Sequence, residues 1–85
     1  MSDELIHLQL EILDCFSVGW RLEAIDKVNN LICVASIADI DMGKLRIHYD
    51  GWDVRYDFWC QPWSNLIQPV GYCQQKGKPL SPPRS

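Results

Sequence analysis

The sequence predicts a mainly β fold, a small barrel of short strands that follows a helical N-terminal arm. The chain has 85 residues, which is enough for one domain. Short apolar or alternating segments follow one another closely between residues 20 and 60. Turn-forming residues, Asp41-Met42-Gly43 and Asp50-Gly51, separate these segments. Short strands joined by tight turns are typical of small barrels.

Residues 3–14, DELIHLQLEILD, predict the helical arm. They contain no glycine or proline, and Leu5, Leu8 and Ile12 recur at helical spacing. Ser2 is suited to cap the N-terminus of such a helix. The strict alternation of HLQLEIL also fits a strand, but the helix is the favoured interpretation. We expect its apolar face to pack on the rest of the chain or on another copy.

Two strands are expected before residue 41. The first, Trp20–Asp26, alternates weakly between apolar and polar residues. The second, Leu31–Ile40, is a nearly continuous apolar run. A run of this kind predicts a central strand that is buried on both faces.

The next strand shows the clearest alternation in the chain. Lys44–Tyr49 directs three apolar side chains to one face, namely Leu45, Ile47 and Tyr49. Asp50-Gly51 ends this strand, and the aromatic segment Arg55–Cys60 predicts another short one.

The C-terminal segment Gln68–Ser85 is predicted to be irregular, because it holds four of the five prolines. Pro82-Pro83 would end any regular element and is expected to mark the domain limit. The expected organisation is therefore an arm over residues 1–15, a barrel core over residues 16–83 and a tail at residues 84–85.

Charge and composition exclude several classes of function. The formal net charge is −3, and nucleic-acid binders usually present a basic face. A negative balance is compatible with a basic partner, such as a lysine-rich tail. No apolar run approaches the roughly 18 residues that a membrane span needs. The acidic N-terminus is unlike a secretory signal, so we expect neither export nor membrane attachment.

The cysteines predict neither a metal site nor a disulfide framework. Cys15, Cys33, Cys60 and Cys73 include no close pair, and neither histidine adjoins a cysteine. Zinc sites normally show closely spaced ligands. Without a secretion signal we expect four free thiols, no bound metal and no cofactor.

One constellation suggests binding chemistry. Aromatic and acidic residues alternate over nine positions, namely Tyr49, Asp50, Trp52, Asp53, Tyr56 and Asp57. In a loop between two strands the three rings could wall a pocket, and the negative faces of aromatic rings attract organic cations. An ordinary aromatic mini-core explains the rings equally simply. The aspartates could in principle pair for hydrolysis, but turn and rim positions suit them better.

Four segments resemble a malignant brain tumour (MBT) repeat. They are FSVGWRLEAID, NNLICVASIADI, LRIHYDGWDVRYDFWC and QPVGYCQQKGKPLSPP, which together span about residues 16–83. The resemblance implies an SH3- or Tudor-like β-barrel with an extended, partly helical arm. Binding repeats of this family recognise mono- and dimethyl-lysine on histone tails through an aromatic cage and one acidic residue.

The resemblance assigns the cage position by position. The aromatic residues are Tyr49, Trp52 and Tyr56, with Tyr49 standing where the family usually has Phe, and the acidic residue is Asp26. From the residues alone, Asp26 would be a turn residue before Lys27. The resemblance also implies that Glu23 is a structural acid near the pocket and that Phe58 and Trp59 form a buried aromatic pair.

The expected function is therefore that of a chromatin-associated reader of methylated lysine, acting in the nucleus in transcriptional repression. The expected partners are methyl-lysine on histone tails or other proteins, together with neighbouring MBT repeats or chromatin proteins. No enzymatic activity and no direct nucleic-acid binding are expected. The alternative is a scaffold repeat whose pocket is closed and which mediates protein–protein interactions in a repressor complex.

Overall fold

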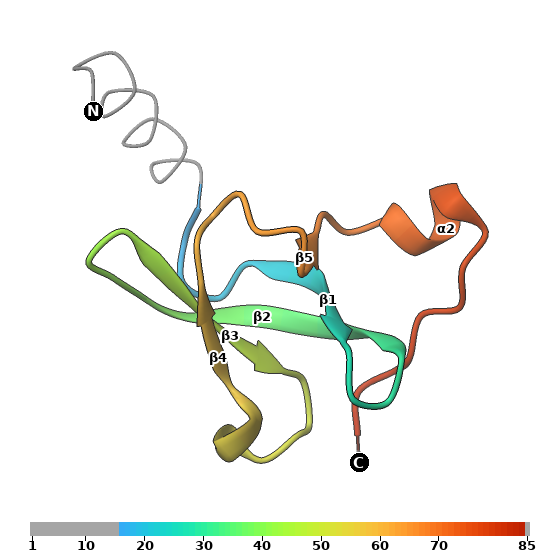
Figure 1. Ribbon diagram of the computed structural model, residues 1–85, viewed down its shortest axis with the longest axis horizontal. Coiled ribbons are helices and arrows are strands. Elements are labelled where there is room, and N and C mark those ends of the chain that lie inside the picture. The colour runs from blue at the N-terminus through green and yellow to red at the C-terminus, as the bar shows by residue number, and fades with distance from the viewer. Residues whose placement is uncertain (1–15, 85) are drawn as a thin grey trace.

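A computed structural model describes residues 16–84, and it confirms the mainly β architecture (Figure 1). A five-stranded antiparallel sheet runs in the order β4-β3-β2-β1-β5. The elements are β1 (Arg21–Asp26), β2 (Leu31–Asp41), β3 (Lys44–Tyr49), the 3₁₀-helix η1 (Val54–Tyr56), β4 (Phe58–Cys60), β5 (Ile67–Gln68) and α2 (Tyr72–Lys76). The predicted arm over residues 1–15 lies outside the described residues.

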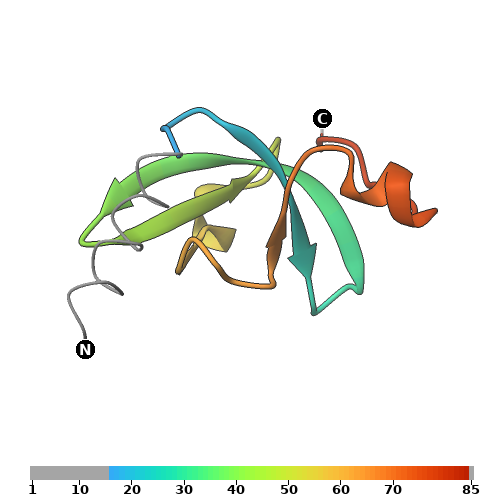
Figure 2. The ribbon, with the colours of Figure 1, turned by 90° about the horizontal axis from the view of Figure 1, so that it is seen from above.

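The long strand β2 curls the sheet. Its first half, Leu31–Ser36, pairs with β1, and its second half, from Ala35 to Asp41, pairs with β3. The register shifts between Ile37 and Asp39, and such bulges bend a strand and increase its twist. As a result the sheet wraps around one face, as Figure 2 shows, in the manner of a partly open barrel.

The core lies inside this curl and contains side chains from all five strands. It consists of Leu22, Ala24, Cys33, Ala35, Ile37, Leu45, Ile47, Tyr49, Cys60 and Ile67. The alternation predicted for Lys44–Tyr49 is confirmed, because its three apolar side chains are all buried.

The prediction that β2 is buried on both faces was wrong. Cys33, Ala35 and Ile37 are buried, whereas Ile32 and Val34 on the opposite face are only half-buried. The physical reason is that, within residues 16–84, the C-terminal segment lies against this outer face and covers it only in part. Its Ser81 bonds the backbone of Ile32 and of Val34.

The predicted strand Arg55–Cys60 is shorter than expected. Only Phe58–Cys60 pairs with β3, and the preceding residues Val54–Tyr56 form η1. The Asp53 carboxylate accepts a hydrogen bond from the Arg55 amide at 2.9 Å, which caps this turn. The side chain of Asp53 therefore stabilises a turn where a strand was predicted.

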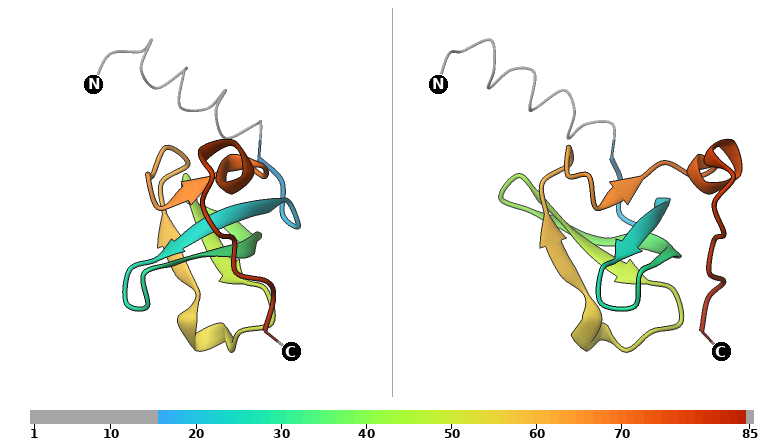
Figure 3. Two further views of the ribbon diagram at one scale, coloured as in Figure 1. Left: turned by 90° about the vertical axis from the view of Figure 1, so that its right-hand side faces the viewer. Right: turned by 45° about the vertical axis from the view of Figure 1, so that its right-hand side comes forward.

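The C-terminal segment is more regular than predicted. It contains α2 and then an isolated bridge in which Ser81 pairs with Cys33. In Figure 3 the segment leaves α2 and returns along the sheet toward the loop that precedes η1. The domain limit expected at Pro82-Pro83 stays a prediction, and Arg84 beyond it still bonds the backbone of Asp50. Among the described residues no helix is long and apolar enough to cross a membrane.

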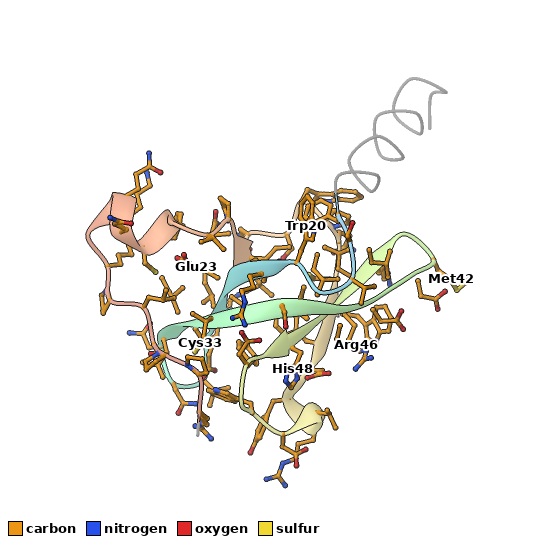
Figure 4. The ribbon with its side chains drawn as sticks, turned by 180° about the vertical axis from the view of Figure 1, so that it is seen from behind. Trp20, Glu23, Cys33, Met42, Arg46 and His48 are labelled. Carbon is orange, nitrogen blue, oxygen red and sulfur yellow. The ribbon has the colours of Figure 1, made fainter. Side chains whose placement is uncertain are left out.

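Glu23 fixes α2 to the sheet. Its side chain lies on the side of β1 that faces α2 (Figure 4), and only 2% of the residue is exposed. The carboxylate accepts hydrogen bonds from the amides of Gly71 at 2.7 Å and Cys73 at 2.8 Å. Burial by itself would raise the pKa of Glu23, but these amide hydrogen bonds outweigh it, so its pKa is lowered below 4.5.

We predict that Glu23→Gln destabilises the fold at neutral pH. A depressed pKa contributes stability that is present above the ordinary value of 4.5 and is lost as the pH falls through the folded-state value. Loss of a charged acceptor from two buried amides should cost about 1–3 kcal/mol. Urea denaturation at pH 7, and at successive pH values below 4.5, measures this free energy of unfolding.

Asp41→Asn is the matched control, because it removes an exposed carboxylate at the end of β2. The control should unfold like the parent at every pH. Equal stability of Glu23→Gln and the parent at pH 7 would show that the carboxylate charge does not stabilise α2.

Candidate functional site: an aromatic cavity with one carboxylate

The four residues assigned by resemblance line one cavity of about 420 Å³. This volume falls within the range of about 300–1,000 Å³ that is typical of small-ligand pockets. The cavity is open to solvent at the end of the sheet where β1 and β3 finish. Its lining consists of Ile25, Asp26, Lys27, Val28, Tyr49, Trp52, Tyr56, Phe58, Trp59 and Leu66.

Tyr49 forms the floor of the cavity. It is the last residue of β3, its ring belongs to the core, and only 7% of it is exposed. Its hydroxyl donates a hydrogen bond to the carbonyl of Ile25 at 3.0 Å. Burial, with the nearby Asp26 charge, raises the pKa of Tyr49 to about 12, so the hydroxyl remains a donor at physiological pH.

Trp52 and Tyr56 form walls that rise from the loop after β3. The Trp52 ring centroid lies 4.9 Å from that of Tyr49, and the two planes are tilted by 35°. Tyr56 meets Trp52 edge-on, with centroids 5.4 Å apart and planes at 88°. Tyr56 is 44% exposed, so it stands at the rim. Three rings with differing orientations can surround an organic cation.

Asp50 anchors the start of this loop. Its carboxylate accepts hydrogen bonds from Arg21 at 2.8 Å and from the Ser36 hydroxyl at 2.9 Å. The Asp50 amide also donates to the carbonyl of Val34. The loop therefore leaves β3 in a direction that is fixed by β1 and β2.

Asp57 anchors the other end of the loop, immediately after Tyr56. Arg46 donates to its carboxylate at 2.8 Å, and Nδ1 of His48 lies 2.7 Å from its second oxygen. Arg46 and His48 are two residues apart on β3 and project from the same side of the strand (Figure 4). The polar face of β3 thus positions the cavity wall.

Asp26 lies at the end of β1 and is only 7% exposed. Its carboxylate accepts hydrogen bonds from the Val28 amide at 3.0 Å and from the Asn29 amide at 3.4 Å. The side-chain amide of Asn29 donates to the second oxygen at 2.7 Å. A carboxylate offers roughly four acceptor positions. Asp26 is therefore both a turn residue and a cavity residue with one position left for a further donor.

Sequence reasoning missed Asn29, which orients the Asp26 carboxylate. The signal that could have revealed it is the spacing Asp26-Lys27-Val28-Asn29, because Asp often begins a turn by bonding backbone amides two or three residues later.

The prediction that Phe58 and Trp59 form a buried aromatic pair is correct for Phe58 alone. Phe58 packs against the core, and its ring lies 5.7 Å from that of Tyr49. Trp59 is 46% exposed. Adjacent residues of a strand point to opposite faces, so the two rings cannot both enter the core. Glu23, expected to be a structural acid rather than a ligand contact, does not line the cavity and instead holds the start of α2.

Over residues 16–84, no group of three or more His, Cys, Asp or Glu side chains is arranged to hold a metal ion. Cys33, Cys60 and Cys73 are free and buried, and Cys15 lies outside the described part of the chain. Burial raises the pKa of all three thiols, for Cys73 to about 11. Thiols in this state are poor nucleophiles.

Comparison with known proteins gives one consistent family. The family model of the mbt repeat matches residues 20–85. Lethal(3)malignant brain tumor-like protein 1 of Gallus gallus is 51% identical over 70 residues, which cover 81% of this chain and 8% of that protein. MBT domain-containing protein 1 of Homo sapiens is 48% identical over 71 residues, covering 82% of this chain and 11% of that protein. The chain thus spans about a tenth of the length of these relatives.

A solved structure agrees in fold. The four MBT repeats of Drosophila melanogaster Sfmbt, determined in complex with the peptide RHR (me)K VLR, superpose with a TM-score of 0.78 and 38% identity. The match covers 82% of this chain and 16% of that one. Sequence, fold and the family match therefore agree, and the chain belongs to the MBT repeat family.

Proposed function

We propose that this repeat binds mono- and dimethyl-lysine side chains by insertion into the cavity formed by Tyr49, Trp52 and Tyr56. The observation that carries the proposal is the convergence of these three rings with the Asp26 carboxylate on one open cavity. The complex of the Sfmbt repeats with a methyl-lysine peptide supports it, because that structure shares this fold.

The rings favour a methylated ammonium over a free one. The face of an aromatic ring is electrostatically negative, and each close cation–π contact contributes about 0.5–2 kcal/mol. An unmodified ammonium loses more hydration on entering an apolar cavity, because it is a compact and strongly hydrated charge. Methyl groups spread the charge and add apolar surface that packs against Trp52 and Tyr49.

Asp26 distinguishes the methylation states. Mono- and dimethylammonium retain an N–H that the free acceptor position of Asp26 can bind, and such charge-assisted bonds contribute about 1.5–3 kcal/mol. Trimethyl-lysine has no N–H, so the largely buried carboxylate would gain no hydrogen bond from it. Asn29 holds one carboxylate oxygen at 2.7 Å, which fixes the direction of the remaining acceptor position.

The proposed cellular role is chromatin binding in the nucleus, with histone tails as the favoured ligands. The names of the relatives and the charge of −3, which suits a basic tail, support this role. A binding module is favoured over an enzyme because Asp50, Asp53 and Asp57 are each occupied in holding the cavity loop. A non-binding scaffold repeat is the alternative, and the open cavity argues against it.

We predict that dimethyl- and monomethyl-lysine bind with similar affinity, well above trimethyl-lysine and unmodified lysine. The reason is that only the first two offer both a methylated cation and an N–H. Titration of each amino acid derivative, followed by tryptophan fluorescence, measures the four affinities because Trp52 lines the cavity. A preference for trimethyl-lysine would contradict the role of Asp26.

We predict that Asp26→Asn weakens dimethyl-lysine binding by about 10- to 150-fold, equivalent to about 1.5–3 kcal/mol. The substitution preserves the size of the side chain and removes the charge. Since Asp26 also caps a turn, thermal unfolding must be measured alongside the titration. Asp41→Asn, at an exposed position, should leave the affinity unchanged. Parental affinity in Asp26→Asn would show that the carboxylate does not contact the ammonium.

We predict that Trp52→Ala lowers the affinity by about 5- to 30-fold, since it removes a wall contributing about 1–2 kcal/mol. Trp63→Ala is the matched control, because Trp63 is exposed and does not line the cavity. Isothermal titration calorimetry suits both variants, since removal of a tryptophan alters the fluorescence itself. Equal losses in the two variants would show that the effect is not specific to the cavity.

A further inference from the structure

The C-terminal segment reaches the wall of the cavity from outside. The guanidinium carbon of Arg84 lies 3.9 Å from the centroid of the Trp52 ring, which places the cation over a ring face. Arg84 is absent from the cavity lining, whereas Trp52 belongs to it. Trp52 therefore contacts the cavity and the Arg84 guanidinium at once.

The backbone places Arg84 in this position. The amide of Ser81 donates to the carbonyl of Ile32 at 2.8 Å, and the amide of Arg84 donates to the carbonyl of Asp50 at 3.1 Å. These bonds fasten the segment to β2 and to the loop that carries Trp52. The close approach needs the glycine at position 51, where a Cβ atom would lie 2.7 Å from the backbone nitrogen and carbon of Arg84.

We propose that Arg84 is a positioning residue that holds the Trp52 ring in the orientation that binds the cation. The inference rests on the proposed function of the cavity. Trp52 extends from a loop and is only partly buried, so packing alone leaves its ring some freedom. The Arg84 guanidinium restrains the ring before the ligand arrives, and less conformational entropy is then lost on binding.

The charge of Arg84 does not oppose this role. Its side chain is exposed, so solvent and salt screen its repulsion of a cation in the cavity. Arg55 makes a similar contact with Tyr56, at 5.0 Å from the ring centroid. Because this distance is longer, Arg55 restrains its ring less strongly. Removal of Arg84 should therefore lower the affinity more than removal of Arg55.

The variant Arg84→Ala tests the proposal on the full chain. Arg84→Lys is the conservative variant, because it keeps the positive charge. Lys76→Ala is the control, because it removes one exposed positive charge elsewhere. Arg84→Ala should bind dimethyl-lysine about two- to five-fold more weakly, with an unchanged melting temperature. Arg84→Lys should recover most of the affinity, and Lys76→Ala should match the parent. The Trp52 indole N–H resonance, assigned with Trp52→Phe, should shift in ligand-free Arg84→Ala.

Unchanged or tighter binding by Arg84→Ala, while the parent binds dimethyl-lysine, would overturn this inference and leave the proposed function intact. An unshifted Trp52 resonance in Arg84→Ala would also overturn it. A parent chain that binds no methyl-lysine would overturn the proposed function itself, and with it the site that Arg84 is proposed to position.

Discussion

The burial of Tyr49 at the end of β3 is the constraint on which the cavity depends. The ring belongs to the core and is also the cavity floor, and its hydroxyl bonds the carbonyl of Ile25 at 3.0 Å. This bond joins the end of β3 to the end of β1, where Asp26 follows. Those two ends meet because both strands pair with the first half of β2, where Ile25 lies opposite Ile32 and Tyr49 lies opposite Ala35. Their shared pairing with β2 thus brings a carboxylate to an aromatic floor.

The acidic side chains around the cavity differ in which residues their carboxylates contact. Asp50 accepts hydrogen bonds from Arg21 and Ser36, and Asp57 contacts Arg46 and His48, so both carboxylates fasten the loop to neighbouring strands. Asp26 makes its hydrogen bonds within its own turn, which leaves one of roughly four acceptor positions for a further donor at the cavity. The same residue type therefore serves two purposes. What distinguishes them is whether the partners lie on other strands, as for Asp50 and Asp57, or within the residue's own turn, as for Asp26.

The alternation of apolar and polar residues was enough to predict β3. Leu45, Ile47 and Tyr49 lie on one face because successive strand residues point to opposite sides, and no distant contact is needed to predict this. The helix α2 was missed because its cap is supplied by Glu23, 48 residues earlier than Gly71. The half-exposed face of β2 was missed because hydrophobicity does not show which other segment packs against a strand or how completely that segment covers it.

The candidate site was also only partly predictable from the sequence. Resemblance to the MBT repeat assigned Asp26, Tyr49, Trp52 and Tyr56 to one binding site, which stays a prediction, and all four line one cavity. Arg84 could not be found in this way, because its contact with Trp52 depends on the path of the C-terminal segment across β2.

The cavity residues differ in how deeply they are buried, and therefore in how much they contribute to the stability of the fold. Tyr49 lies in the core, so its loss would remove packing along with the cavity floor. Trp52 and Tyr56 stand on a loop that is held by polar contacts. Trp52 is only partly buried, and Tyr56 is 44% exposed. Changes to these walls can therefore reshape the cavity while the sheet stays folded. A cavity with a fixed floor and adjustable walls allows related repeats to differ in what they bind without changing how they fold.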